Sequence, residues 1–338
     1  MVELLLNDKK VDFNAQDDEG MLPVMVAVKN GFTDIAELFL RSDFSARIYW
    51  NLCDQRGFTC LFWAATSDFE DLVSLLLKQS EIVQGIDKPG ARHSPLASAA
   101  RKGYVQIVIA LLDHSATPDA KDDREGRAAL SWAAGNGHED VVDRLLRCED
   151  IDINHADRRL KWTAFQWAAA QKQGAIAWKI LHETLERLGN RWRDYISTLF
   201  LDVAKRGQYE ALNILLELHD FDPDFRDRDS QRTALSFAAE HGHVRIVQRL
   251  LSSGRVNVNA GDVGRKTALM WTADQGRSSV VKELLAREEL DILAVDSEER
   301  CACDWAQASN HLDVQRLIED RQHRVVHRSR SRQSSGTS

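Results

Sequence analysis

Apolar residues recur along the chain in a pattern that alternates two short helical segments. In the clearest copy, Leu130, Ala133 and Ala134 follow helical spacing within residues 128–136, which predicts a short helix with a narrow apolar face. Gly137 comes next and is expected to end that helix with a positive φ. Residues 138–147 predict a second helix, whose apolar face is formed by Val141, Val142, Leu145 and Leu146. The pattern therefore indicates pairs of short antiparallel helices.

Two markers show that this pair is repeated along the chain. The first marker is the residue that ends each first helix: Gly31, Asp68, Gly103, Gly137, Lys172, Gly207, Gly242, Gly276 and Asn310. Successive markers lie 37, 35, 34, 35, 35, 35, 34 and 34 residues apart. The second marker is an apolar doublet eight residues further on, such as Leu145-Leu146, and it keeps the same phase. Two markers in phase over so many periods predict a stack of about nine similar units.

Aspartate-rich segments separate the helix pairs. Asp17, Asp54, Asp123, Asp262 and Asp296 each lie 14 residues before their marker, whereas Asp157 and Asp227 lie 15 before theirs. An aspartate side chain can accept hydrogen bonds from backbone N–H groups two residues on, which stabilises a tight turn. These segments are therefore predicted to form turns that project as fingers between the helix pairs.

The combination resembles the ankyrin repeat, and residues 123–138 match its pattern best, from the turn aspartate to the Gly-His after the first helix. Tetratricopeptide repeats are a structural rival of similar length, but they lack the aspartate finger and the Gly-His. The Leu-Ser-Trp-Ala-Ala variant is similar to repeats of fungal ankyrin arrays attached to nucleotide-binding signalling proteins. The resemblance implies an all-α fold with β-turn fingers, an ankyrin-repeat solenoid of about nine repeats plus a partial N-terminal one, over residues 1–320.

Several segments depart from the pattern. Residues 1–16 form a partial repeat with a second helix and no first, which favours a fragment or truncated gene model over a frayed first helix. The unit 182–216 lacks the aspartate finger, its helix over 175–188 is lengthened, and Asp202 stands where other units have tryptophan. This unit is interpreted as a degenerate repeat in which Asp202 faces a gap or pairs with an arginine; the alternative is a hinge, or a pocket beside an exposed Trp192. Residues 321–338 are rich in arginine and serine and are expected to form a disordered tail.

Tryptophan recurs at one position of the repeat, five residues before the marker. Trp63, Trp132, Trp167, Trp271 and Trp305 occupy it, and Phe237 stands there too. Because the placement is periodic, it predicts packing between stacked repeats rather than a ligand site.

Composition and motifs argue against chemistry. The chain has 338 residues and a net charge of −8, which disfavours a general nucleic-acid binder, and no apolar run reaches the 18 residues of a membrane span. The five cysteines form no Cys-x-x-Cys pair, and the first residues lack a signal peptide, so an intracellular location, cytoplasmic or nuclear, is expected. His241 and His243 resemble a metal pair, but His243 is the repeat's own Gly-His and recurs as His138, so it is interpreted as a histidine that bonds neighbouring turns. Phosphate-binding, nucleophile and metalloprotease motifs are absent, so no catalytic residue, cofactor or metal site is predicted.

The resemblance implies a protein partner on the concave face, which is made of fingers and first helices. The family's contact positions carry over to Gln55, Arg56, Phe58, Arg124, Glu125, Arg127, Asn136, Glu240, His241, Val263, Arg265, Asp274 and Gln275. Segments 121–127, 157–161, 225–232 and 262–266 hold 11 basic and 7 acidic residues, which favours an acidic segment as the ligand of a monomeric scaffold. Two alternatives stay open: a regulatory or recognition segment of a larger signalling protein or enzyme, or nucleic-acid association through the Arg-Ser tail.

Overall fold

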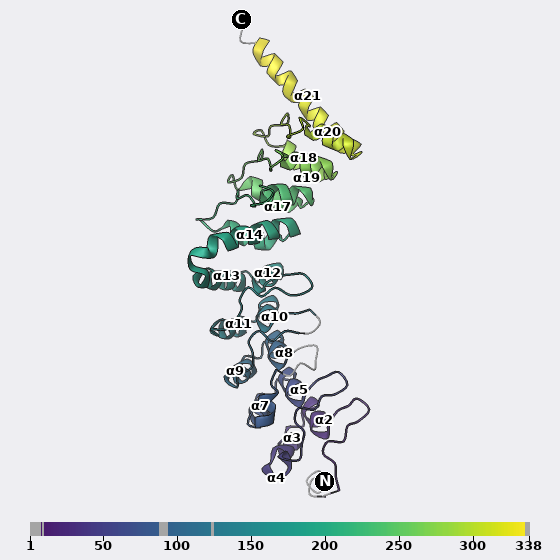
Figure 1. Ribbon diagram of the computed structural model, residues 1–338, viewed down its shortest axis with the longest axis vertical. Coiled ribbons are helices and arrows are strands. Elements are labelled where there is room, and N and C mark those ends of the chain that lie inside the picture. Colours follow the sequence, from purple (N-terminus) through teal and green to yellow (C-terminus); the bar gives the residue numbers. More distant parts are fainter. Residues whose placement is uncertain (1–7, 9, 88–93, 123–124, 335–338) are drawn as a thin grey trace. The chain divides into compact units, whose positions relative to one another are not determined.

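The computed structural model describes residue 8 and residues 10–87, 94–122 and 125–334, with the backbone alone described at 42–43 and 326–334. The chain divides into two compact units, residues 1–187 and 188–338, which are called unit 1 and unit 2 below. Each unit consists of inner helices, which follow the fingers, and outer helices, which follow the markers (Figure 1).

Unit 1 contains five described helix pairs. Its inner helices are α2 (Pro23–Lys29), α5 (Cys60–Thr66), α8 (Pro95–Lys102), α10 (Ala129–Asn136) and α12 (Ala164–Ala170). Its outer helices are α3 (Thr33–Leu40), α6 (Glu70–Leu76), α9 (Val105–Asp113), α11 (Glu139–Leu146) and α13 (Gly174–Leu188). Two short helices, α4 (Ser42–Ser45) and α7 (Ser80–Gln84), follow α3 and α6. Neighbouring inner helices pack against one another, and α2, α5, α8 and α10 each also pack on their own outer helix, so the unit has two helical layers.

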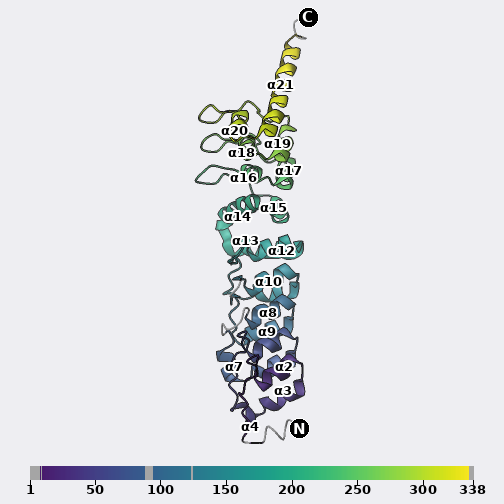
Figure 2. The ribbon, with the colours of Figure 1, turned by 90° about the vertical axis from the view of Figure 1, so that its right-hand side faces the viewer.

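Unit 2 has the same two layers. The inner helices are α14 (Trp192–Arg206), α16 (Ala234–Glu240), α18 (Ala268–Asp274) and α20 (Ala302–Ala308). The short 3₁₀ helix η1 (Gly189–Arg191) immediately precedes α14. The outer helices are α15 (Tyr209–Leu216), α17 (Val244–Ser252), α19 (Ser278–Leu285) and α21 (Leu312–Ser334). The fingers before α16, α18 and α20 extend from one side of the unit (Figure 2). Two of them carry a single antiparallel bridge, Arg226 with Thr233 and Gly261 with Thr267.

The nine marker positions end their helices as predicted. All nine have φ between 59° and 83°, including the non-glycine residues Asp68, Lys172 and Asn310. Glycine adopts this left-handed conformation freely, whereas a side chain makes it costly, so the three exceptions show how strongly the repeat imposes the turn.

The core lies between the two layers of each unit. In the clearest copy, Ala133 and Ala134 of α10 and Leu145 of α11 have no exposed surface. The small alanines let the inner helices approach closely, and the leucines and valines of the outer helices fill the remaining space. The part of the chain that the structure describes is helical and holds no strand, so the all-α fold class is confirmed.

The degenerate segment is built as the sequence indicates. The lengthened helix α13 and the inner helix α14 each have 15 residues, and Gly189–Arg191 replaces a finger. Asp202 pairs with Arg206 on the same helix at 2.6 Å and also lines a groove of about 500 Å³ beside Phe225 and Phe237. The pairing and the gap expected at Asp202 are therefore both present. Trp192 is half-buried rather than exposed.

Two terminal predictions have different outcomes. The tail prediction is wrong for residues 321–334, because α21 continues through them to Ser334. Its arginines, glutamines and histidines are compatible with a helix, and no glycine or proline interrupts the segment. The partial repeat proposed for residues 1–16 depends on residues 1–7 and 9, which lie outside the described residues.

Candidate binding surface

The finger aspartates bind both their own turn and the tryptophan of the same repeat. Asp122 accepts hydrogen bonds from the backbone N–H of Glu125 at 2.5 Å and of Arg127 at 3.1 Å. The indole N–H of Trp132 donates to the same carboxylate at 3.2 Å. The sequence placed this role at Asp123, which lies outside the described residues. Asp122 holds the role, 15 residues before the marker, as Asp157 and Asp227 do in their fingers.

Four more repeats show the same aspartate–tryptophan bond. The distances are 3.2 Å for Asp54 with Trp63, 2.9 Å for Asp157 with Trp167, 3.0 Å for Asp262 with Trp271, and 3.1 Å for Asp296 with Trp305. The bond ties each indole, which belongs to an inner helix, to the finger of its repeat, and each tryptophan is half-buried. The prediction that these tryptophans pack within the array is confirmed, but they lie at its inner surface and not in the core.

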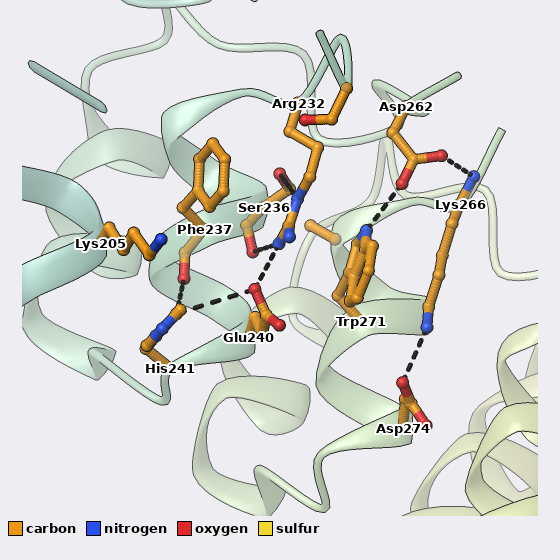
Figure 3. A network of polar contacts seen from close by, with 12 residues as sticks. Lys205, Arg232, Ser236, Phe237, Glu240, His241, Asp262, Lys266, Trp271 and Asp274 are labelled. Atoms are coloured by element: carbon orange, nitrogen blue, oxygen red, sulfur yellow. Dashed lines mark hydrogen bonds and ion pairs between the residues drawn. The ribbon is translucent and has the colours of Figure 1, made fainter. Parts of the chain in front are cut away.

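Cations alternate with these rings along unit 2 (Figure 3). The guanidinium of Arg232 lies 4.2 Å from the ring centroid of Phe237 and 3.9 Å from that of Trp271. The ammonium of Lys266 lies 3.9 Å from Trp271 and 3.5 Å from Trp305. Arg300 covers Trp305 at 3.9 Å. Each of these cations comes from a finger and contacts the ring of its own repeat; Arg232 and Lys266 also contact the ring of the next.

Two cations of this series are balanced by acids on the inner helices. Arg232 donates to Glu240 at 2.6 Å, and Lys266 donates to Asp274 at 2.8 Å (Figure 3). Glu240 and Asp274 were both predicted as partner contacts, and the structure places them in these internal pairs, half-buried.

Unit 1 has a shorter version of the same arrangement. The guanidinium of Arg127 is sandwiched between Trp132 and Trp167, 3.7 Å and 3.8 Å from their ring centroids. Arg101 approaches the ring of Trp132 at 5.1 Å. Arg127 is only 5% exposed, so it is not the solvent-facing contact that the sequence suggested.

The other predicted contact positions differ in accessibility. Exposed side chains are those of Gln55, Arg56, Asn136, His241, Val263, Arg265 and Gln275. Phe58 and Glu125 are half-buried, with Phe58 stacked on Phe62 at 3.9 Å and Glu125 paired with Arg159 at 3.6 Å. Arg124 lies outside the described residues. The exposed set follows the fingers and the ends of inner helices within each unit.

The sequence contained a signal for the cation series that the family's contact positions do not include. A cation stands five residues before the ring in Arg127–Trp132, Arg232–Phe237, Lys266–Trp271 and Arg300–Trp305. An i, i+5 spacing is not a helix neighbour, so only the fold of the finger over the inner helix brings the two together.

The histidines after the markers connect repeats within each unit. In unit 1, His138 Nε2 lies 3.0 Å from the carbonyl oxygen of Arg101, and in unit 2, His243 Nε2 lies 3.0 Å from that of Lys205. The interpretation of His243 as a residue that bonds the neighbouring turn is therefore confirmed. Among the described residues, no group of three or more His, Cys, Asp or Glu is arranged to hold a metal ion.

The cysteine thiols of the described residues are free, and two are poor nucleophiles. Burial raises the pKa of Cys60 to about 12, and burial together with the carboxylate of Glu319 raises that of Cys303 to about 12. We expect Cys60 to resist alkylation at pH 8 in the native protein and to react fully in denaturant, as measured by mass spectrometry. Equal labelling rates in both conditions would contradict the burial of this thiol.

Comparison with known proteins agrees with the geometry. A family model for ankyrin repeats in three copies matches residues 1–88, 80–157, 96–190 and 199–296, and the chain belongs to the ankyrin-repeat family. It is 26% identical to an ankyrin repeat and KH domain-containing protein, mask-1, of Caenorhabditis elegans, over 69% of this chain and 8% of that protein. It is 29% identical to the ankyrin repeat protein nuc-2 of Neurospora crassa, over 48% of this chain and 15% of that one.

A third relative has an enzymatic name. The chain is 27% identical to a probable E3 ubiquitin-protein ligase, XBOS32, of Oryza sativa, over 51% of this chain and 33% of that protein. The chain thus spans a third or less of the length of each of these relatives. Ankyrin repeats themselves are typically non-enzymatic and mediate protein–protein interaction. None of the described helices is both long and apolar enough to cross a membrane.

Proposed function

We propose that the chain is a non-catalytic scaffold of about nine ankyrin repeats that binds an acidic segment of a partner protein. The ligand would lie along the fingers and inner helices. The location inside the cell and the monomeric state stay predictions from the sequence.

The difference in burial between acids and bases in the fingers carries this proposal. The turn aspartates Asp122 and Asp157 are buried and accept hydrogen bonds from their own fingers. Basic side chains of the same segments are exposed, as at Arg159, Arg228 and Arg265. Arg159 and Arg228 form exposed ion pairs with Glu125 and Asp194, and the Arg265 guanidinium donates to the carbonyl oxygens of Val295 and Asp296. The net charge of the accessible finger side chains is therefore more positive than the net charge of all the finger side chains together, although the whole chain carries −8. Such a surface attracts an acidic ligand and repels a basic one.

Charge reversal in the fingers of unit 2 tests the proposal. We expect the double variant Arg228→Glu/Arg265→Glu to weaken binding of an affinity-captured partner about tenfold at low salt, because two exposed attractions become repulsions. The difference should shrink as salt rises. Calorimetric titration at two salt concentrations measures both effects.

The matched control is Lys282→Glu, which reverses an exposed charge on the outer helix α19. It changes the net charge in the same direction and should leave affinity nearly unaltered. An unchanged affinity of the double variant at low salt, or an equal loss in the control, contradicts the finger surface as the binding site.

A second candidate follows from the length of the relatives. Because the chain matches only part of each of them, the same surface could serve as the recognition segment of a larger signalling protein or enzyme. Reading the genomic sequence upstream of Met1 tests this. Nucleic-acid association through the Arg-Ser segment is tested by deleting residues 321–338 and measuring RNA binding.

A further inference from the structure

Two of the four repeats with a finger cation lack the acid that the other two place against it. Glu240 and Asp274 each stand eight residues after the cation that they bind, Arg232 and Lys266. After Arg300 the position is Ala308, and Arg300 pairs with Asp296 and Glu298 instead. The other repeat is that of Arg127. The position eight residues after Arg127 is Gly135, which has no side chain. Arg127 is therefore set in the same frame without the internal carboxylate.

The two arginines are otherwise held in the same way. Arg232 Nη2 donates to the carbonyl oxygen of Ser236 at 3.3 Å and to Glu240 Oε2 at 2.6 Å. Arg127 Nη2 donates to the carbonyl oxygen of Ser131, the equivalent residue, at 2.6 Å. An ideal Cβ built on Gly135 would lie 3.1 Å from Arg127 Nη2, so position 135 faces the nitrogen that binds the acid in the other repeat.

Arg127 is also poorly satisfied for a buried cation. Its side chain is covered by two tryptophans, and its buried Nε has no hydrogen-bond partner. Burial, with a smaller contribution from the neighbouring charge of Arg101, lowers the pKa of Arg127 to about 10 against the carboxylates of Glu125, Asp157 and Asp122, which raise it. Asp157 and Asp122 already accept hydrogen bonds from their fingers and from Trp167 and Trp132.

We propose that Arg127, Trp132, Trp167 and the missing side chain at Gly135 form a niche that binds one Asp or Glu carboxylate of the partner segment. The bound carboxylate takes the position that Glu240 takes beside Arg232, and it accepts from Arg127 Nη2. The exposed Arg101, 5.1 Å from the centroid of the Trp132 ring, adds positive potential beside the niche. This assignment rests on the proposed function, because it names the chemical group that the inner surface recognises.

An internal carboxylate tests the geometry of the niche. Gly135→Glu restores the residue type found at position 240, and Gly135→Ala is the matched control, since both remove the flexibility of a helical glycine. We expect Gly135→Glu to melt about 2–4 °C higher than Gly135→Ala when Arg127 is present, and no higher in an Arg127→Met background. Equal melting temperatures of the two variants with Arg127 present would overturn the niche.

A direct titration tests ligand binding in the full chain. The probe is a capped peptide, acetyl-Gly-Gly-Glu-Gly-Gly-amide, followed by NMR signals of the Arg127 side-chain N–H and the Trp132 and Trp167 indoles. We expect shifts that saturate in the millimolar range for the wild type, and none for Gly135→Glu or for the glutamine peptide. Loss of response in Gly135→Ala as well would show that filled space, and not the carboxylate, blocks the site, and would overturn the assignment.

Three further outcomes complete the test: the first concerns the chemical group that the niche binds, and the other two separate this inference from the proposed function. An uncapped Gly-Gly-Gly peptide that shifts these signals when the glutamate peptide does not would show that the niche takes a chain terminus, and would overturn the side-chain assignment. If the captured partner depends on Arg228 and Arg265 but binds Gly135→Glu with wild-type affinity, the scaffold stands and the niche fails. If the peptide titrates Arg127 but finger charge reversal has no effect on the partner, the niche stands and the proposed function fails.

Discussion

Replacing Asp296 by alanine is expected to lower the free energy of unfolding of unit 2 by roughly 3 kcal/mol. The carboxylate is 2% exposed and accepts from the backbone N–H groups of Glu298 and Arg300 at 2.8 Å and 2.9 Å. Its other oxygen accepts from the side chains of Arg300 at 3.0 Å and Trp305 at 3.1 Å. Removal leaves these donors without an acceptor in a place that water reaches poorly, and this accounts for the size of the effect.

The same carboxylate makes stability depend on pH in a defined direction. Burial alone would raise the pKa of Asp296, but the hydrogen bonds from Arg300, Glu298 and Trp305 outweigh it and lower the pKa. The folded pKa therefore lies below the unfolded value of about 3.9, so the stabilisation is complete above that value and is lost as pH falls through the folded pKa. We expect Asp296→Asn to be clearly less stable than the wild type at pH 7 and the difference to shrink below about pH 4.

Denaturant titrations at several pH values measure both effects. The control is Glu298→Ala, which removes a carboxylate that is largely exposed and keeps the backbone N–H that donates to Asp296. Its cost should stay within about 0.5 kcal/mol. A penalty for Asp296→Asn that is the same at pH 3 and pH 7 would show that the charge of this group does not contribute.

The helix pairs and their ends could be predicted because they depend on local physics. Helical spacing of apolar residues and the positive φ at the markers act within a few residues, and they recur in phase, so each copy supports the next. The register of one finger could not be predicted. Asp122 and Asp123 are adjacent and chemically identical, and only the extra residue in the finger brings Asp122 beneath the N–H groups of the turn.

The candidate site was only partly predictable for a different reason. The family's contact positions identify which residues face the inner surface, but not which of them already have internal partners. Glu240 and Asp274 are occupied by cations of their own repeats, and Arg127 is covered by rings of two successive repeats. These contacts join residues about 5 to 40 positions apart through side-chain conformations that periodicity does not specify. The significance of Gly135 emerges only from comparing it with repeats in which an acid is present.

Phe200→Ala is expected to destabilise unit 2 by about 3–5 kcal/mol, although it lies in the degenerate segment. Phe200 belongs to α14, has no exposed surface, and packs edge-on against Phe221 with ring centroids 4.9 Å apart. Ile196 and Val203 of the same helix are also fully buried. Because α14 packs against both α15 and α16, the loss of the ring removes contacts shared by two layers.

This prediction decides between the two sequence interpretations of the segment. A structural repeat requires α14 to be protected from hydrogen exchange as strongly as α16, and it requires Phe200→Ala to speed exchange in both helices. A hinge requires fast exchange over residues 192–205 in the wild type and little effect of Phe200→Ala on α16. The control Phe200→Leu keeps most of the buried volume. It should lower the free energy of unfolding by about 1–1.5 kcal/mol, which is less than half the effect of Phe200→Ala. Because Phe200 is wholly buried where a hinge would need loose packing, we expect the first result.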